Sequence, residues 1–146
     1  MEKVSSYLKE LGVQKGDRVV GFLPNVPEAV VAMLATSSLG AVWSSCSPDF
    51  GTNGVLDRFS QIEPKVIFSA YGYRYNGRYY DSLKRLNDVI KELPTVQKVI
   101  LIDNDNSDEK NPKFEFISYN KILEGTPNPI RFEQLPFDHP LYIMYS

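Results

Sequence analysis

The stretch RVVGFLPNVPEAVVAMLATSSLGAVWSS, residues 18–45, decides the fold. It opens with an apolar run at 18–23 and closes with a second at 41–45, both typical of buried strands. Between them, Asn25 is a candidate helix cap, Pro27 suits the first helical turn, and Gly40 is a natural stop. The apolar face of this helix is expected to consist of Val30, Val31, Leu34 and Leu39. The segment therefore predicts a strand, a helix and a second strand.

The same alternation extends on both sides of this segment. A helix ending at Gly12 is expected before it, and apolar residues at helical spacing predict further helices over 55–62 and 83–93. Each of these two is followed by a proline and then by an apolar strand, at 65–69 and 98–102. Four strands alternating with three helices predict an α/β fold: a doubly wound, mainly parallel sheet with helices on both faces.

The remainder of the chain is less regular. Residues 103–112 are polar and acidic and predict a surface loop. A short strand is expected at 114–116 and a helical turn at 119–123, followed by an irregular connector over 126–140. Residues 141–146 have the composition of a strand, and no turn or cap follows them, so we expect the chain to stop inside a larger domain.

Composition excludes several classes of protein. The 146 residues include 42% hydrophobic and 23% charged residues with a net charge of −2, which fits one globular domain and gives no bulk attraction for nucleic acid or anionic membranes. One cysteine, Cys46, and one histidine, His139, cannot form an internal disulfide or a four-ligand zinc site. The first residues are polar and helical in pattern, without the apolar core of a signal peptide. A cytosolic protein is expected.

Ligands of open parallel sheets bind beyond the carboxyl ends of the strands. This rule selects the segments 24–25, 46–54 and 70–80 as candidate binding loops. The second loop has neither the Walker spacing nor G-x-G-x-x-G, and its Asp49 or Thr52 is equally suited to cap the next helix. The third interleaves tyrosines with Arg74 and Arg78, which suits a nucleotide-bearing ligand; the alternative is a tyrosine-rich turn packed on the sheet edge.

Other reactive residue types have structural interpretations. Cys46 and Trp43 lie in or beside a strand and are expected in the core, and His139 has no catalytic partner in the sequence. Asp57 and Arg58 are expected to form a surface pair on a helix.

Residues 40–65, GAVWSSCSPDFGTNGVLDRFSQIEPK, closely resemble the acetoacetate–CoA ligase branch of the acyl-adenylate-forming (AMP-dependent synthetase/ligase) superfamily, with the part from Ser47 to Ile62 specific to that branch. Residues 16–34 are similar to the superfamily more widely. Residues 138–146, DHPLYIMYS, resemble the lead-in to its Ser-Gly-Thr-Thr-Gly-type phosphate loop. The likeness implies that residues 1–146 are part of an AMP-binding domain, truncated just before that loop.

The resemblance implies a two-step reaction in the intact parent protein. ATP and acetoacetate give an acyl-adenylate and pyrophosphate, and the thiol of CoA then displaces AMP; Mg²⁺, the phosphate loop and a later lysine are needed. The isolated chain is therefore expected to be inactive. The alternatives are a fragment of another short-chain acyl-CoA ligase, a non-catalytic nucleotide- or CoA-binding module, and a flavodoxin-like interaction domain.

The resemblance also implies positions for bound ligands, although no catalytic or metal-binding residue. Residues matched to the CoA site of related acetate–CoA ligases are Asn76, Gly77 and Arg78, with Ser47, Pro48 and Asp49 beside the pantetheine. The start of the ATP phosphate-loop motif corresponds to Tyr145 and Ser146. The relatives carry a second arginine three residues before the one matched by Arg78, whereas Arg74 is four residues before it.

Overall fold

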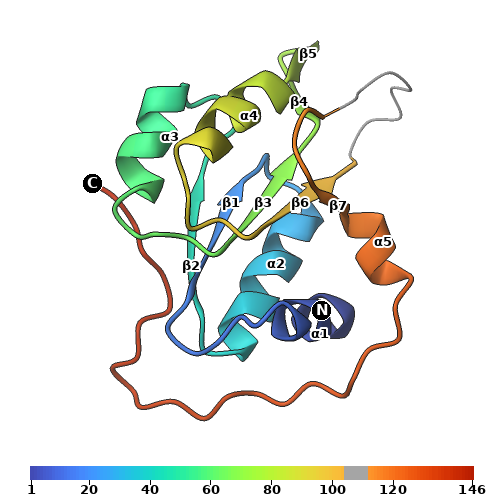
Figure 1. The fold of residues 1–146 in the computed structure, drawn as a ribbon, viewed down its shortest axis with the longest axis vertical. Coiled ribbons are helices and arrows are strands. Elements are labelled where there is room, and N and C mark those ends of the chain that lie inside the picture. Colours follow the sequence, from blue (N-terminus) through green and yellow to red (C-terminus); the bar gives the residue numbers. More distant parts are fainter. Residues whose placement is uncertain (104–111) are drawn as a thin grey trace.

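The computed structural model describes residues 1–103 and 112–146 (Figure 1). The helices are α1 (Glu2–Glu10), α2 (Pro27–Ser38), α3 (Thr52–Phe59), α4 (Leu83–Lys91) and α5 (Tyr119–Leu123). The strands are β1 (Arg18–Phe22), β2 (Val42–Cys46), β3 (Val66–Ala70), β4 (Gly72–Tyr75), β5 (Arg78–Asp81), β6 (Lys98–Ile102) and β7 (Ile117–Ser118). No helix in these two described ranges is long and apolar enough to cross a membrane.

Five strands form one parallel sheet in the order β2-β1-β3-β6-β7, and β4 pairs with β5 in a separate antiparallel ribbon. The helices cover both faces of the parallel sheet, with α1, α2 and α5 on one side and α3 and α4 on the other (Figure 1). The predicted fold class is therefore confirmed.

Alternate residues of each central strand supply two apolar layers. In β1, Val19 packs with the α1/α2/α5 layer, while Val20 and Phe22 pack with the α3/α4 layer. In β3, the completely buried Phe68 and Ile67 divide in the same way. Because both faces of these strands are covered, their sequences are continuously apolar rather than alternating.

Gly21 is required in β1 by close packing across the sheet. Trp43 of β2 lies over it, and a Cβ built at Gly21 would come within 2.7 Å of the indole carbon Cζ2. Trp43 is 5% exposed and its ring lies 6.2 Å from that of Phe68, which confirms its predicted place in the core.

The amino ends of the strands are held by two cationic side chains. Arg18 donates hydrogen bonds to the backbone oxygens of Ile62 (2.6 Å), Gly16 (3.0 Å) and Glu63 (3.2 Å). Lys65 donates to the Gly12 oxygen (2.8 Å) and pairs with Asp17 (3.1 Å). These bonds satisfy carbonyl groups that the ends of the secondary structure leave unpaired.

One prediction about α2 is wrong, and a second is confirmed only in part. Val26, not Asn25, is the N-cap residue, because Pro27 occupies the first helical position and the cap must directly precede it. Of the predicted apolar face, Val31 and Leu39 pack against the core, but Val30 and Leu34 are 54% and 45% exposed. The fully buried residues of α2 are Ala32, Ala35, Thr36 and Ser38. Because α2 is apolar nearly all round, its sequence periodicity did not identify the face that packs on the sheet.

Two other predicted elements also differ from the structure. The helix expected over 55–62 ends at Phe59, since the carbonyl of Ile62 turns toward Arg18. Residues 114–116 form no strand; the rings of Phe114 and Phe116 contact each other instead, with centroids 6.3 Å apart, and β7 follows them. The helical turn at 119–123 is confirmed as α5, and 126–140 is an irregular connector.

Residues 141–146 form a single parallel bridge, between Tyr142 and Trp43, instead of the expected strand. The backbone N–H of Trp43 donates to the Leu141 oxygen and that of Ile143 to the Trp43 oxygen. This C-terminal segment runs beside β2, the edge strand of the sheet (Figure 1). Of the predicted acidic loop, residues 104–111 lie outside the described residues.

Candidate functional site

The three predicted binding loops meet at one cleft. A cavity of about 960 Å³ opens beyond the carboxyl ends of β1 and β2, and each loop contributes to its wall. Its lining is Leu23, Pro24, Asn25, Val26, Ser45, Cys46, Ser47, Pro48, Asp49, Tyr73, Arg74, Tyr75 and Tyr80. This volume is within the range of sites for cofactor-sized ligands, and its wall combines aromatic, hydroxyl and charged groups.

The predicted residues Ser47, Pro48 and Asp49 all line this cleft. The Ser47 hydroxyl donates to the Asp49 carboxylate, and Arg85 of α4 donates to the Pro48 backbone oxygen at 2.9 Å. Arg85 therefore fixes the loop from outside the cleft, a role that the sequence analysis missed. The alternative in which Asp49 or Thr52 caps the next helix is wrong, because the N-cap of α3 is Gly51 and no side chain bonds there.

The segment 70–80, predicted as a loop, contains the ribbon of β4 and β5. Asn76 and Gly77 form its turn with φ of 50° and 77°, the left-handed conformations that a two-residue hairpin turn requires. The sequence contained this signal, since Asn-Gly between tyrosine-rich runs is a strong hairpin indicator. The stacked rings of Tyr73 and Tyr80, with centroids 5.2 Å apart, join the two strands.

The ribbon separates the two arginines. Arg74 is opposite Tyr79 and Arg78 is opposite Tyr75, so the arginine side chains belong to opposite faces of the ribbon. Arg74 lines the cleft, and its guanidinium lies 5.9 Å from the centre of the Tyr79 ring. Asn76, Gly77 and Arg78 are exposed at the tip and are absent from the cleft wall. The resemblance favoured Arg78, which lies outside the cleft wall, whereas Arg74 is the arginine that lines the cleft.

A second cavity of about 480 Å³ lies beside the cleft, between β2, α3 and the C-terminal segment. The predicted Tyr145 lines it, whereas the exposed Ser146 does not. The Tyr145 hydroxyl donates to the backbone oxygen of Arg58 at 2.8 Å, and burial raises the pKa of that phenol.

Arg58 does not form the predicted surface pair with Asp57. Its guanidinium lies 4.7 Å from the centre of the Phe50 ring and 5.9 Å from that of Tyr145, and it donates to the Gly54 oxygen at 2.9 Å. Arg58 therefore joins the loop 46–54 to the C-terminal segment through cation–π and hydrogen-bond contacts. Its spacing on α3 gave no indication of this role.

Cys46 and His139 have the structural environments expected of them. Cys46 is 4% exposed, and burial raises the pKa of its thiol to about 11, with only partial compensation by the nearby Arg58 charge, so at neutral pH it is a protonated thiol. The His139 ring nitrogen Nε2 lies 2.8 Å from the Gly40 oxygen. Within residues 1–103 and 112–146, no group of three or more His, Cys, Asp or Glu side chains is placed to hold a metal ion.

The comparisons with known proteins agree on one family. The model of the family described as "AMP-binding enzyme" matches residues 1–146. The chain is 50% identical to acetoacetyl-CoA synthetase of Danio rerio over 95% of its length, and 40% identical to acetoacetyl-coenzyme A synthetase of Rhizobium meliloti (strain 1021) over 100%. A solved structure of acetoacetyl-CoA synthetase from Streptomyces lividans matches 99% of the chain with a TM-score of 0.90 and 43% identity.

The chain is much shorter than these relatives. It spans 22% of the Danio rerio protein, 23% of the Rhizobium meliloti protein and 22% of the Streptomyces lividans chain.

Proposed function

This chain belongs to the family of AMP-binding enzymes, and from that premise we propose that it is part of an acetoacetate–CoA ligase. The observation that carries the proposal is the 50% identity to an acetoacetyl-CoA synthetase over 95% of the chain. The intact parent would activate acetoacetate with ATP to an acyl-adenylate, releasing pyrophosphate, and CoA would then displace AMP to form the thioester. This activity fits the lipid, fatty-acid or ketone-body metabolism of the cytosol.

We propose that residues 1–146 supply a partial AMP-binding domain and one wall of the CoA site. The cleft has room for an extended ligand between the loop at Ser47–Asp49 and the β4–β5 ribbon. The pantetheine of CoA would pass beside the loop at Ser47–Asp49, and the nucleotide end of CoA would reach Asn76, Gly77 and Arg78 at the ribbon tip. A guanidinium there can pair with phosphate and stack on adenine at the same time.

Arg74 is a second candidate for the phosphates of CoA. It lines the cleft, whereas Arg78 lies beyond the lining residues. The two arginines lie on opposite faces of one ribbon, so they would contact different parts of one ligand or only one of them would contact it. Separate substitution of each arginine distinguishes these possibilities.

We propose that Tyr145 and Ser146 lead into the loop that holds the ATP phosphates. In support, the contacts of Tyr145 with Arg58 hold the C-terminal segment against α3. Mg²⁺ would neutralise phosphate charge in the parent enzyme. The described residues do not fit a resident Mg²⁺ site, because no group of three or more candidate ligand side chains is placed together. We therefore assign no step of the reaction to a metal held by this chain.

The activity is tested with a chimera. In the Streptomyces lividans acetoacetyl-CoA synthetase, which matches 99% of this chain at a TM-score of 0.90, the corresponding segment would be replaced by residues 1–146. Release of pyrophosphate that depends on acetoacetate is the expected result. A folded chimera that releases no pyrophosphate in response to acetoacetate would contradict the proposal. The isolated chain should show no ATP–pyrophosphate exchange, and exchange above background would contradict that expectation.

The CoA site is tested by calorimetric titration of the chain with CoA. Arg78→Ala is expected to weaken binding about tenfold, the loss of one charge-assisted contact. Lys91→Ala on α4 is the matched control, because that lysine is exposed and lies outside the cleft. Unchanged affinity in Arg78→Ala together with a loss in Arg74→Ala would move the nucleotide site to the cleft wall. Tight CoA binding by the chain combined with an inactive chimera would favour the non-catalytic module.

A further inference from the structure

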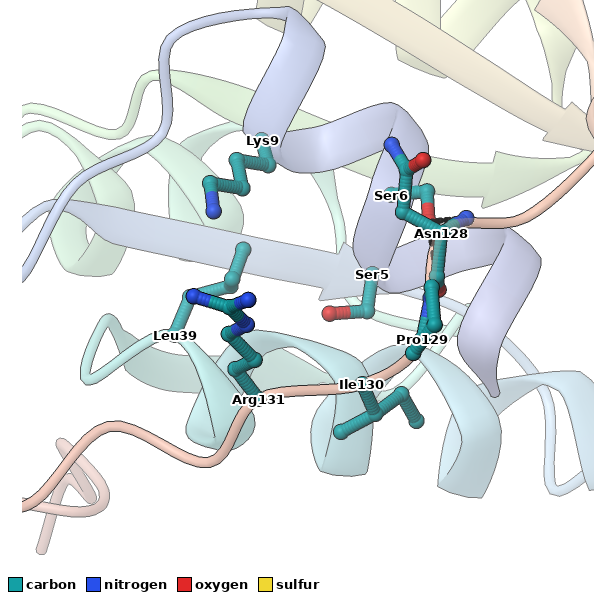
Figure 2. Close-up of a pocket in the computed structure, with 8 residues that line it drawn as sticks. All are labelled: Ser5, Ser6, Lys9, Leu39, Asn128, Pro129, Ile130 and Arg131. Atoms are coloured by element: carbon teal, nitrogen blue, oxygen red, sulfur yellow. Dashed lines mark hydrogen bonds between the residues drawn. The ribbon is translucent and has the colours of Figure 1, made fainter.

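A third cavity lies away from the cleft, at the opposite end of the sheet. Its volume is about 340 Å³, and it is bounded by α1, the end of α2 and the connector over 126–140 (Figure 2). Leu39 and Lys9 lie at the ends of helices that precede β2 and β1, so this cavity is beside the amino ends of those strands. It shares no lining residue with the CoA cleft.

Two cationic side chains face each other across this cavity. Lys9 extends from α1 and Arg131 from the connector, and Figure 2 shows their charged ends pointing toward one another. They are the charged residues of the lining, which includes no carboxylate. In the two described ranges of the chain, neither side chain has a hydrogen-bond or ion-pair partner. Two like charges directed at one space repel each other, and an anion between them converts that repulsion into two attractions.

Neutral donors are available beside the two cations. The Asn128 side-chain amide has two N–H groups. The Ser6 hydroxyl donates a long 3.4 Å bond to the Asn128 backbone oxygen, and its oxygen accepts the Asn128 backbone N–H at 3.0 Å, so its proton can turn to a ligand. Ser5 has a different role, because the Ser38 hydroxyl donates to the Ala35 oxygen at 2.7 Å and must therefore accept from Ser5. Ser5 forms a fixed wall, and the donors for a ligand come from the connector and the exposed side of α1.

We propose that this cavity binds a small phosphate-bearing anion. Arg131 matches two phosphate oxygens with its forked N–H groups, and Lys9 supplies the second positive charge. A phosphate dianion matches two cations in charge and offers more acceptor oxygens than a carboxylate. Leu39, Pro129 and Ile130 give the cavity an apolar side that accommodates a short organic group. The ligand class is inorganic phosphate or a small phosphomonoester.

A bound anion would hold the connector against α1. The connector already contacts this region through the backbone N–H of Asn128, which donates to Ser6 Oγ at 3.0 Å, and that of Glu133, which donates to the Ser38 oxygen at 2.9 Å. The same connector continues to the C-terminal segment beside β2. The ligand would therefore stabilise the path of the chain between α5 and Tyr145.

The test is a titration of the ¹⁵N-labelled chain with sodium phosphate at constant ionic strength, with chloride as the balancing ion. Chemical-shift changes are expected at residues 5–9 and 128–131, together with a rise in Tm. The double variant Lys9→Gln/Arg131→Gln should bind phosphate at least about tenfold more weakly. The matched control is Lys84→Gln/Lys91→Gln, which removes the same charge from α4 on the other face of the sheet and should bind normally. The residues substituted in both double variants are on the surface, and a melting curve in chloride checks that each variant is folded.

Two further arms separate the possible ligands. Phenyl phosphate binding as tightly as phosphate or more tightly supports a phosphomonoester site, and acetate should bind far more weakly. Equal binding of acetate, or unchanged phosphate affinity in Lys9→Gln/Arg131→Gln, overturns the proposal. The proposal is also overturned if Arg78→Ala loses phosphate binding while Lys9→Gln/Arg131→Gln retains it, because the anion would then bind near the CoA site. The cavity does not depend on the proposed ligase activity, so failure of either idea leaves the other standing.

Discussion

The parallel sheet and the β4–β5 ribbon use aromatic residues and arginine in opposite ways. In the sheet, Phe68 is completely buried and Arg18 donates three bonds to backbone oxygens. In the ribbon, Tyr75 is 70% exposed and Arg78 is exposed at the tip. The comparison teaches that the same residue types stabilise the fold where they are enclosed and remain available to a ligand where they are not.

The largest expected difference is between Phe68→Ala and Tyr75→Ala. Removing the buried Phe68 side chain should lower the free energy of unfolding by about 3–5 kcal/mol through lost burial and a cavity between β1 and β6. Tyr75→Ala should change it by no more than about 0.5 kcal/mol, since Tyr75 is on the surface. Urea denaturation measures both. Similar losses in the two variants would show that the ribbon is part of the cooperative core.

Substitution of Arg18 should lower stability, whereas substitution of Arg78 should weaken CoA binding. Arg18→Ala leaves the oxygens of Ile62, Gly16 and Glu63 without their donor, so we expect a loss of about 1.5–3 kcal/mol of unfolding free energy. Arg78→Ala should leave unfolding unchanged and weaken CoA binding. Denaturation and CoA titration of both variants give a two-by-two test, and a stability loss in Arg78→Ala would contradict the division of roles.

The ribbon turn offers a smaller effect. Gly77 has a φ of 77°, which a β-branched residue adopts only at a cost of about 1–2 kcal/mol. Gly77→Val should therefore distort the turn and weaken CoA binding, while the melting temperature of the sheet stays unchanged. Gly77→Asn is the control, because asparagine tolerates this conformation. Equal CoA affinity in the two variants would mean that the tip does not contact the ligand.

The remaining prediction concerns pH. Burial raises the pKa of the Cys46 thiol from 9.0 to about 11. Below pH 9 the thiol is protonated in both states, and above it the unfolded chain ionises first, so the unfolding free energy should fall between pH 9 and 11. Cys46→Ala should have a shallower decline over this window than the parent chain in parallel urea titrations. Identical slopes would show that the thiol is ionised equally in both states.

The sequence predicted the central sheet well because its signals are local. The apolar runs that became β1, β3 and β6 lie between turns and helices with clear starts and stops, and each strand was found within one residue of its predicted position. The three candidate loops followed from the rule for parallel sheets, and they do line one cleft. Residues 1–146 as part of an AMP-binding domain, and the roles of the six CoA-site residues with Tyr145 and Ser146, remain predictions.

The errors share a physical cause. In α2, apolar residues surround the helix, so Val30 and Leu34 were expected inside although the fully buried positions are occupied by small residues. Aromatic residues at 114–116 indicated a strand, yet the side chains of Phe114 and Phe116 contact one another and the segment is not a strand. Propensity describes what a residue can do locally, and tertiary packing selects among those possibilities.

By itself, the sequence determined a parallel α/β sheet and its family, because strand and helix periods, turn residues and the run from Ser47 to Ile62 are encoded in consecutive positions. Only the tertiary structure decided which arginine lines the cleft, what Arg58 contacts, and that Lys9 and Arg131 face one cavity from distant parts of the chain. Those outcomes depend on strand register and on the path of the connector, which bring together residues whose separation in the sequence carries no signal.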